Sequence, residues 1–324
     1  MRPSPTDWVP SGAWLAPGYA EWAPPEALRG AVACLWVSIT PEAADQADQA
    51  DQTDQVDEAD QTGQTDQAAP ANQAVRSGLV LPDACSDLIW EQGVGAYVAG
   101  PDTGPARPMI KAGMVIVGVR FRPSAGGQVL KTPLSEIANQ RVPLADLLPP
   151  AGRRLPSALD PEEAAGRILA ITGALVVDGT PDPAMARAAV LLRDPAARAE
   201  AVAAEVGLSE RQFRRRSQAA VGYGPKTLQR VLRFHRFVRL LDAASGTAAL
   251  TPTAPDAPPT PPAACAPYAS PAPGRAAPPA PPDLAALAAR VGYADQAHLT
   301  RECSALSGLT PARLAQVRGG RQQA

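Results

Sequence analysis

The sequence lacks the features that mark a membrane protein, a disulfide-rich protein or a metal site. It holds no run of about 18 apolar residues, the length that a transmembrane helix requires. Its first residues lack the apolar stretch of a secretory signal. The four cysteines form no Cys-x-x-Cys pair: they are Cys34, Cys85, Cys265 and Cys303. We therefore expect a cytoplasmic chain with reduced thiols and no bound metal.

Catalytic patterns are also missing. There is no Ser/His/Asp set and no phosphate-cradling Gly loop, so the sequence predicts neither a catalytic site nor a cofactor. Cys85 could be a reactive thiol, but a small buried hydrophobic role is favoured. Trp36 and Trp90 could line a ligand pocket, and packing in the core is the default interpretation.

Charge is unevenly distributed along the chain. Residues 1–194 carry 14 Lys and Arg against 24 Asp and Glu, a net −10, whereas residues 195–324 carry 16 against 8, a net +8. Such asymmetry indicates a basic module, often one for nucleic acid. A solvated, arginine-rich helix face would give the same count.

Two segments have compositions that a packed core cannot use. Residues 45–67 repeat Asp and Gln with a period of three and hold no basic residue, so we expect a disordered, self-repelling insert over 43–74. An acidic interaction tract or a calcium loop is less favoured, since no Gly-turn ligand loop is present. Residues 247–282 are rich in Pro and Ala, which predicts an extended, disordered spacer over 246–282. A PxxP ligand role is the alternative.

The remaining sequence predicts an α+β protein. β-Branched and aromatic residues bounded by Gly or Pro predict strands at 31–40, 77–82, 86–91, 95–100 and 113–123. Helical periodicity begins at Pro161, and Pro with acidic neighbours marks two helix starts, at 161 and 183. We expect a mainly-β domain over 1–155, a linker helix over 156–180 and an all-α domain over 181–320.

Residues 283–311, "DLAALAARVGYADQAHLTRECSALSGLTP", predict two short helices joined by a tight turn. Asp283 and Asp295 are suited to N-cap positions, and Gly292 to a left-handed helix end. Leu284, Leu287, Ala288 and Val291 form an apolar stripe on the first helix, while the second has an apolar side at Leu299, Cys303 and Leu306 and polar residues opposite. This arrangement is a helix-turn-helix, whose turn angles the second helix outward so that it can enter a major groove.

Residues 196–225 repeat the same pattern. Gly207 interrupts the first helix, Ser209 caps the second, and Gln212 completes a capping box. Phe213 takes the inward position of Leu299. Both copies end with Gly-x-x-Pro, and residues 225–242 between them predict a connecting helix with a largely apolar side and a strongly basic remainder.

The stretches "LSERQFRRR", "GYGPKTLQRVLRF" and "GYADQAHLTRECSALSGLTP" resemble the DNA-binding domain of AraC/XylS-type transcriptional regulators, over residues 183–318. "LPDACSDLIW", "AYVAGPDTGP" and "GVRFRPSAGG" resemble an uncharacterised sensor-like domain that precedes such domains in some bacterial regulators. The resemblance implies sequence-specific binding of double-stranded DNA, with RNA polymerase, a small-molecule effector and a second copy of the chain as further partners, and no membrane.

Carried over residue by residue, the resemblance assigns DNA contacts to the outer faces of the second helices. These residues are Arg211, Gln212, Arg214 and Arg215 in the first unit, and Gln296, Ala297, Thr300 and Arg301 in the second. We assign Lys226 and Arg230 to phosphates. His235 and His298, the two histidines of the chain, are expected to be structural or to flank DNA.

The chain departs from the family pattern in four places. Ser217 and Cys303 replace large aromatic residues, which should loosen each recognition helix by about 1–3 kcal/mol unless compensated. Ser124 replaces the Gly that usually follows the Arg-Pro of "RFRP". The Pro-rich insert either loops out at its junction or frees the second unit. A protein-binding module with a degenerate helix-turn-helix fold is therefore the alternative to a regulator, and an enzyme is a more distant one.

Overall fold

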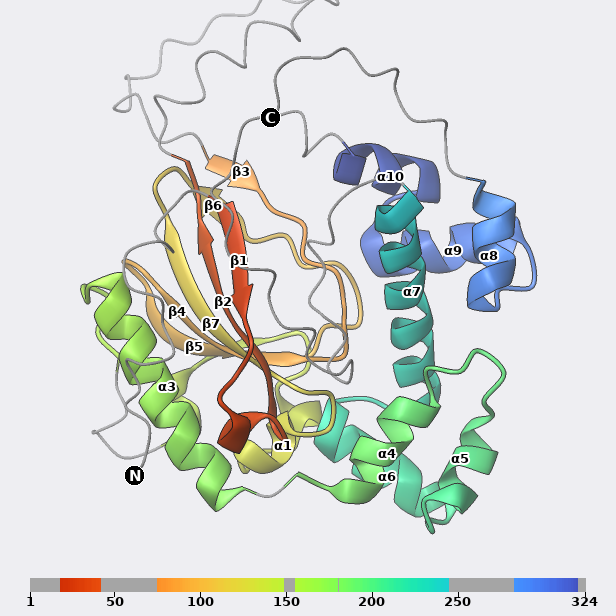
Figure 1. Cartoon of the computed structure of the whole chain (residues 1–324), viewed down its shortest axis with the longest axis horizontal. Helices are drawn as coiled ribbons and strands as arrows, with labels where there is room; N and C mark the ends of the chain where they lie inside the picture. Colours follow the sequence, from red (N-terminus) through yellow and green to blue (C-terminus); the bar gives the residue numbers. More distant parts are fainter. Residues whose placement is uncertain (1–17, 42–74, 149–154, 180, 245–282, 320–324) are drawn as a thin grey trace, which may run out of the picture.

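The computed structural model describes residues 18–41, 75–148, 155–179, 181–244 and 283–319, and it is an α+β protein, as predicted. An antiparallel sheet is formed by residues from the first half, and helices make up most of the second half (Figure 1). Both predicted inserts, residues 43–74 and 246–282, lie outside the described residues.

The main sheet has six strands in the order β1-β2-β7-β4-β5-β8, all paired antiparallel. Their bounds are β1 Gly18–Trp22, β2 Val32–Ile39, β4 Ser86–Glu91, β5 Gly95–Ala99, β7 Val115–Phe121 and β8 Arg141–Pro143. A separate two-stranded sheet pairs β3 (Val75–Ser77) with β6 (Met109–Lys111). Short helical segments lie between the strands or follow the last one: η2 Glu26–Leu28, α1 Gly126–Val129, η4 Leu134–Glu136 and α2 Leu144–Leu147.

Alternating side chains give the main sheet two different faces. Leu35, Leu88 and Phe121 are fully buried on the face that packs against α3 (Pro161–Asp178), whose Ala164 and Ile168 complete the core. Pro161 occupies the first turn of α3, where the sequence predicts a helix start, and Asp160 is its N-cap. The other face carries a smaller cluster, which includes Cys34, Trp36, Ile89 and Ala99.

Four of the five predicted strands form, over 32–39, 86–91, 95–99 and 115–121. The strand predicted at 77–82 is wrong beyond Ser77: Val80 makes one isolated bridge to Ala106 and the ladder does not continue. Pro82, with Pro105 and Pro108 on the facing segment, lacks the N–H that a ladder needs.

The helical half consists of seven helices within the described residues. They are α4 Pro183–Leu191, α5 Ala199–Glu205, α6 Glu210–Val221, α7 Pro225–Ala244, α8 Leu284–Val291, α9 Gln296–Ser307 and α10 Pro311–Gly319. One hydrophobic cluster contains Phe213 of α6, Phe234 of α7, Leu287 of α8, Leu299 of α9 and Leu314 of α10. The second helix pair therefore packs into the same core as the first.

The helical half also packs against the sheet half through α6. A Cβ atom built on Gly127 of α1 would lie 2.4 Å from the carbonyl oxygen of Ala219, so only a glycine permits this approach. At the end of α6, Gly222 faces Pro101 and the backbone of Leu134 in η4. These contacts hold the C-terminal end of α6 and leave its N-terminal half unobstructed by α1 and η4.

Candidate nucleic-acid interface

Helices α5 and α6 form the first helix-turn-helix. Val206 ends α5, and Gly207 turns the chain with a φ of 70°. Ser209 then begins α6 through a capping box: its Oγ accepts from the Gln212 N–H at 3.3 Å, and its N–H donates to Gln212 Oε1 at 2.9 Å. Local side chains thus satisfy donors at the start of α6 and fix its direction.

The two sides of α6 differ sharply in exposure. Phe213, Ser217 and Val221 are buried against the helical core. The four predicted contact residues of this unit are all exposed: Arg211, Gln212, Arg214 and Arg215. Among the described residues, no carboxylate pairs with these three arginines, whereas their neighbour Arg216 contacts Asp182 at 3.4 Å. The exposed side of α6 is therefore a cluster of uncompensated positive charge.

Helices α8 and α9 form the second helix-turn-helix. Gly292 ends α8 with a φ of 81°, and the Asp295 carboxylate accepts from the His298 N–H at 2.6 Å at the start of α9. Leu299 and Cys303 are buried. Figure 1 shows α6 near one end of α7 and α9 beside its other half, so α7 separates the two second helices.

The predicted contact residues on α9 are less uniform than those on α6. Gln296, Ala297 and Arg301 are exposed. Thr300 is half-buried, and its Oγ1 donates to the Gln296 carbonyl oxygen at 2.8 Å, within the helix. The outward surface of α9 therefore offers one guanidinium and one amide beside small side chains.

Hydrogen bonds replace the aromatic packing that the sequence lacks at two positions. Ser217 is fully buried, and its Oγ donates to the Tyr223 carbonyl oxygen at 2.7 Å. Near Cys303, the Ser307 hydroxyl lies 2.7 Å from the Cys303 carbonyl oxygen and 3.1 Å from that of Leu309. Both hydroxyls tie the end of a second helix to the following turn, so the expected loosening is at least partly compensated.

Charged and aromatic contacts fix the second unit to α7. Arg230 Nε donates to Glu302 of α9 at 2.8 Å. The Arg233 guanidinium lies 5.6 Å from the centre of the Tyr293 ring, a cation–π geometry, and the Tyr293 ring meets His298 edge-on at 5.1 Å. Of the two residues assigned to phosphates, Lys226 is exposed, whereas Arg230 is already engaged in this ion pair.

A bidentate ion pair fixes the C-terminal helix as well. Arg318 of α10 donates to both carboxylate oxygens of Asp242 on α7, at 2.5 and 2.6 Å, and Asp242 is 1% exposed. The sequence analysis did not identify this pair. The available signal was that Asp242 is the one acidic residue in the predicted connecting helix, residues 225–242.

A buried polar cluster on the sheet faces α7 from the other side. Arg120 of β7 donates to Asp87 at 3.1 Å, and Trp36 donates to the same carboxylate at 2.7 Å. Burial lowers the pKa of His235 on α7 to about 4. The nearby charges act on the same imidazole: Asp83 raises its pKa, and Arg120 lowers it further. His235 is half-buried, and its lowered pKa favours the uncharged imidazole near neutral pH.

The remaining candidate residues are buried. Cys85 and Cys303 are both buried, and burial raises the pKa of each thiol. The pKa of Cys303 rises to about 11. Neither residue therefore has the lowered pKa of an activated thiolate. Trp90 is fully buried and donates to the Pro156 carbonyl oxygen at 2.8 Å. No metal-binding group of three ligands occurs among the described residues. Within the same ranges, every helix is too short or too polar to span a bilayer.

One family model matches part of the chain. Residues 62–143 match a domain of unknown function, DUF6597. The described part of this range includes β3 to β8, and the match ends before the helices of the second half. No curated protein and no solved structure matches the chain.

Proposed function

We propose that the protein is a sequence-specific transcription regulator of the AraC/XylS type, which binds double-stranded DNA through α6 and α9. Each helix would lie in a major groove, and the two grooves would be successive on one side of the duplex. The observation that carries the proposal is the exposed, unpaired arginine cluster Arg211, Arg214 and Arg215 on the second helix of a capped helix-turn-helix.

The packing of the two units supports binding to two grooves. Two recognition helices held in one rigid body lose little conformational entropy when they bind DNA together. A second unit on a flexible tether would instead gain affinity only through its effective concentration near the first site. Arg230 and Arg233 of α7 contact the second unit, and Arg318 fixes the following helix, α10, to α7. The spacing between α6 and α9 is therefore a property of the fold, and a preferred half-site spacing of about one helical turn is expected.

The sheet domain would supply regulation. The match of residues 62–143 to a domain of unknown function agrees with the resemblance of this half to a sensor-like domain that precedes such DNA-binding domains. In this proposal the protein is cytoplasmic, the sheet half binds an effector or a second copy of the chain, and RNA polymerase is a partner at the promoter. These assignments rest on the resemblance and on the contacts between α6 and the sheet half.

The alternative is a protein-binding module that keeps the helical fold without DNA affinity. The lower charge of the α9 surface, with Ala297 exposed and Thr300 bonded within its own helix, favours this alternative. The two functions differ in their dependence on the α6 arginines and on salt, because phosphate contacts release counterions.

The discriminating experiment measures binding of the full chain to promoter fragments next to its own gene, at two salt concentrations. Replacing Arg215 or Arg301 by Ala should weaken specific binding by about 1–3 kcal/mol each. Arg167→Ala is the matched control, because this exposed arginine lies on α3 and pairs within its own helix with Glu163. Salt-insensitive binding, or equal affinity in all three variants, would favour the protein-binding module.

A further inference from the structure

Residues 100–108 form the loop that joins β5 to β6 and contacts the helical half. The loop contains half of the stretch "AYVAGPDTGP", residues 96–105, to which the DNA-binding proposal gives no role. It is continuous with the main sheet, because β5 ends at Ala99. Its contacts with the helical half include the ends of both α6 and α9, the two proposed recognition helices.

The beginning of the loop packs against the end of α6. Gly222 ends this helix with a φ of 89°, and a Cβ atom built on it would lie 2.5 Å from Cγ of Pro101. Pro101 is buried. The proline ring therefore lies directly against the C-terminal turn of the first unit, where the backbone conformation also favours glycine.

The second part of the loop packs against the end of α9. Gly308 ends α9 with a φ of 70°, and a Cβ atom built on it would lie 3.4 Å from Nη2 of Arg107 and 3.6 Å from Cγ of Pro105. A Cβ atom built on Gly104 would lie 3.8 Å from the carbonyl oxygen of Ala305. A guanidinium is favourable beside the last carbonyl groups of a helix, which carry partial negative charge. One loop thus contacts the same glycine turn in both units.

Hydrogen bonds fix the first part of the loop to the sheet half. The Asp102 carboxylate accepts two bonds from the Arg141 guanidinium of β8, at 3.0 and 2.7 Å. The side-chain oxygen of Asn139 accepts from the Thr103 N–H at 2.8 Å and from the Thr103 hydroxyl at 3.1 Å. The residues that follow Pro101 are therefore held in place by the sheet half.

The second part of the loop is bonded to a segment that belongs to the helical core. Ala106 and Val80 exchange two backbone hydrogen bonds, at 2.9 and 3.0 Å. Leu79 and Leu81, on either side of Val80, pack against the hydrophobic cluster of the helical half. The loop is thus fixed at both ends, and its contacts with α6 and α9 belong to one rigid connection.

This loop constrains the relative position of α6 and α9. Helix α7 separates the two helices (Figure 1), and Arg230 and Arg233 attach the second unit to it. The loop supplies a second attachment, which does not pass through α7. A rotation of the second unit on α7 would move Gly308 away from the loop while Gly222 stays at Pro101.

We propose that residues 100–108 set the spacing between the two recognition helices, with Pro101 positioning α6 and with Pro105 and Arg107 positioning α9. The inference rests on the proposed DNA binding, and it assigns part of the specificity to the sheet half. Helices held at one separation bind half-sites at the matching separation with little loss of entropy, and other separations are disfavoured. All three side chains act through the helix ends, so they are positioning residues.

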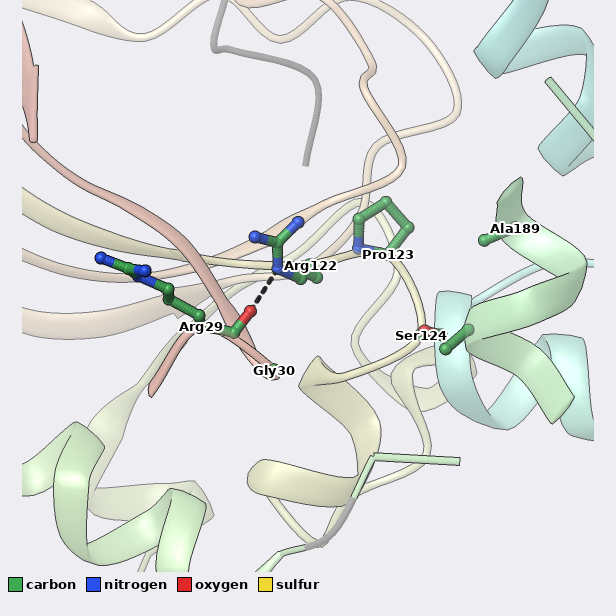
Figure 2. Close-up of a pocket in the computed structure, with 7 residues that line it drawn as sticks. Arg29, Gly30, Arg122, Pro123, Ser124 and Ala189 are labelled. Atoms are coloured by element: carbon green, nitrogen blue, oxygen red, sulfur yellow. Dashed lines mark hydrogen bonds between the residues drawn. The ribbon is translucent and has the colours of Figure 1, made fainter. Parts of the chain in front are cut away.

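A control variant is available where the two halves meet without a recognition helix. Pro123, in the turn after β7, lines a pocket together with Ala186 and Ala189 of α4. Figure 2 shows Pro123 on the sheet side of this pocket and Ala189 on α4 across from it. Pro123→Ala therefore removes the same ring atoms as Pro101→Ala or Pro105→Ala, at a contact that does not involve α6 or α9.

The test measures binding of the full chain to a promoter duplex whose half-sites are located by footprinting, and to a derivative with two base pairs inserted between them. Each base pair turns the second groove by about 35°. The insertion should weaken wild-type binding by at least about tenfold. The double variant Pro105→Ala with Arg107→Ala should bind the original duplex about fivefold more weakly and lose most of the discrimination between the two duplexes. Pro123→Ala should behave as the wild type.

Hydrogen exchange of the same proteins without DNA reports directly on the helix ends. The Gly308 N–H donates to the Ser304 carbonyl oxygen at 2.9 Å, and the Gly222 N–H donates to that of Gln218 at 3.0 Å. The double variant should accelerate exchange at Gly308 by about fivefold and leave Gly222 unchanged, whereas Pro101→Ala should do the reverse. Pro123→Ala should change neither.

Three results would overturn the proposal. The first is wild-type exchange at both glycines in the loop variants. The second is wild-type discrimination between the two duplexes in the double variant. The third is an equal loss of discrimination in Pro123→Ala, which would mean that any change between the two halves has this effect. A wild-type chain that binds no DNA would refute the regulator, whereas faster exchange at Gly308 in the double variant would still support the loop as the element that positions α9.

Discussion

Replacing Arg318 by Met tests how firmly the C-terminal helix α10 is fixed to α7. The Arg318 guanidinium makes two hydrogen bonds to the Asp242 carboxylate, and the side chains are 18% and 1% exposed. Methionine keeps most of the aliphatic stem but leaves a buried carboxylate without its counterion. Breaking a buried pair in this way costs about 3–5 kcal/mol. Since the Arg318 side chain is 18% exposed and water can reach this edge of the pair, we expect the lower value, about 3 kcal/mol.

The assay is urea unfolding of the full chain, followed by far-UV circular dichroism. The double variant Arg318→Met with Asp242→Leu removes both charges, so it should recover most of the loss and unfold within about 1 kcal/mol of the wild type. Arg167→Met is the control, because it breaks an exposed pair with Glu163 that contributes only about 0.3–0.5 kcal/mol. A loss below about 0.5 kcal/mol for Arg318→Met would refute the reasoning and would mean that α10 contributes little to the helical core.

Three further variants test local features of the structure. Ser217→Ala removes the buried hydrogen bond to the Tyr223 carbonyl oxygen and should lower the free energy of unfolding by about 1–2 kcal/mol; an unchanged urea midpoint would show that the hydroxyl does not compensate for the missing aromatic. Ser124→Gly relieves a left-handed φ of 84° and should raise the melting temperature, with a gain of about 1 kcal/mol; a lower melting temperature would contradict the assigned backbone strain. For His235, the folded-state pKa of about 4 lies below the ordinary 6.5. Between these pH values the unfolded chain therefore binds more protons than the folded chain. The free energy of unfolding should fall as the pH falls from about 6.5 to about 4, by at most about 3 kcal/mol. His235→Gln should flatten that part of the stability curve, and an unchanged curve would exclude the buried neutral imidazole.

Short-range chemistry explains why the helix-turn-helix units could be predicted from the sequence. Ser209 and Asp295 cap α6 and α9 through groups three residues away, and Gly207 and Gly292 supply the left-handed turns. Each signal depends only on neighbours in the chain. The outer residues are exposed for the same reason, because helical periodicity fixes which positions lie opposite Phe213 and Leu299.

Contacts between distant segments could not be predicted in this way. Arg230 was assigned to a phosphate because it lies on a basic helix side, but Glu302, 72 positions away in the sequence, pairs with it. Thr300 faces outward by periodicity, yet its hydroxyl bonds within the helix. The short edge strands β1 and β8 lack a strong alternating pattern and acquire their register from β2 and β5.

The contact between Arg29 and Arg122 could not be predicted from sequence patterns either. The two residues are 93 positions apart and come together through the antiparallel pairing of β2 with β7. The "RFRPS" stretch did mark the strained turn after β7, since Ser124 stands where the resembling domain usually has Gly. A departure from glycine at a turn is thus a local signal of strain, although it does not reveal the facing helix.

The most direct test of the central claim is the salt dependence of binding to a promoter duplex, measured by fluorescence anisotropy for the wild type and for the variant that combines Arg211→Ala, Arg214→Ala and Arg215→Ala. If the exposed side of α6 reaches DNA, the wild-type affinity falls steeply with salt, and the triple variant binds much more weakly with a shallower slope, reduced by about one for each lost phosphate contact. A triple variant with the wild-type affinity and slope would contradict the account.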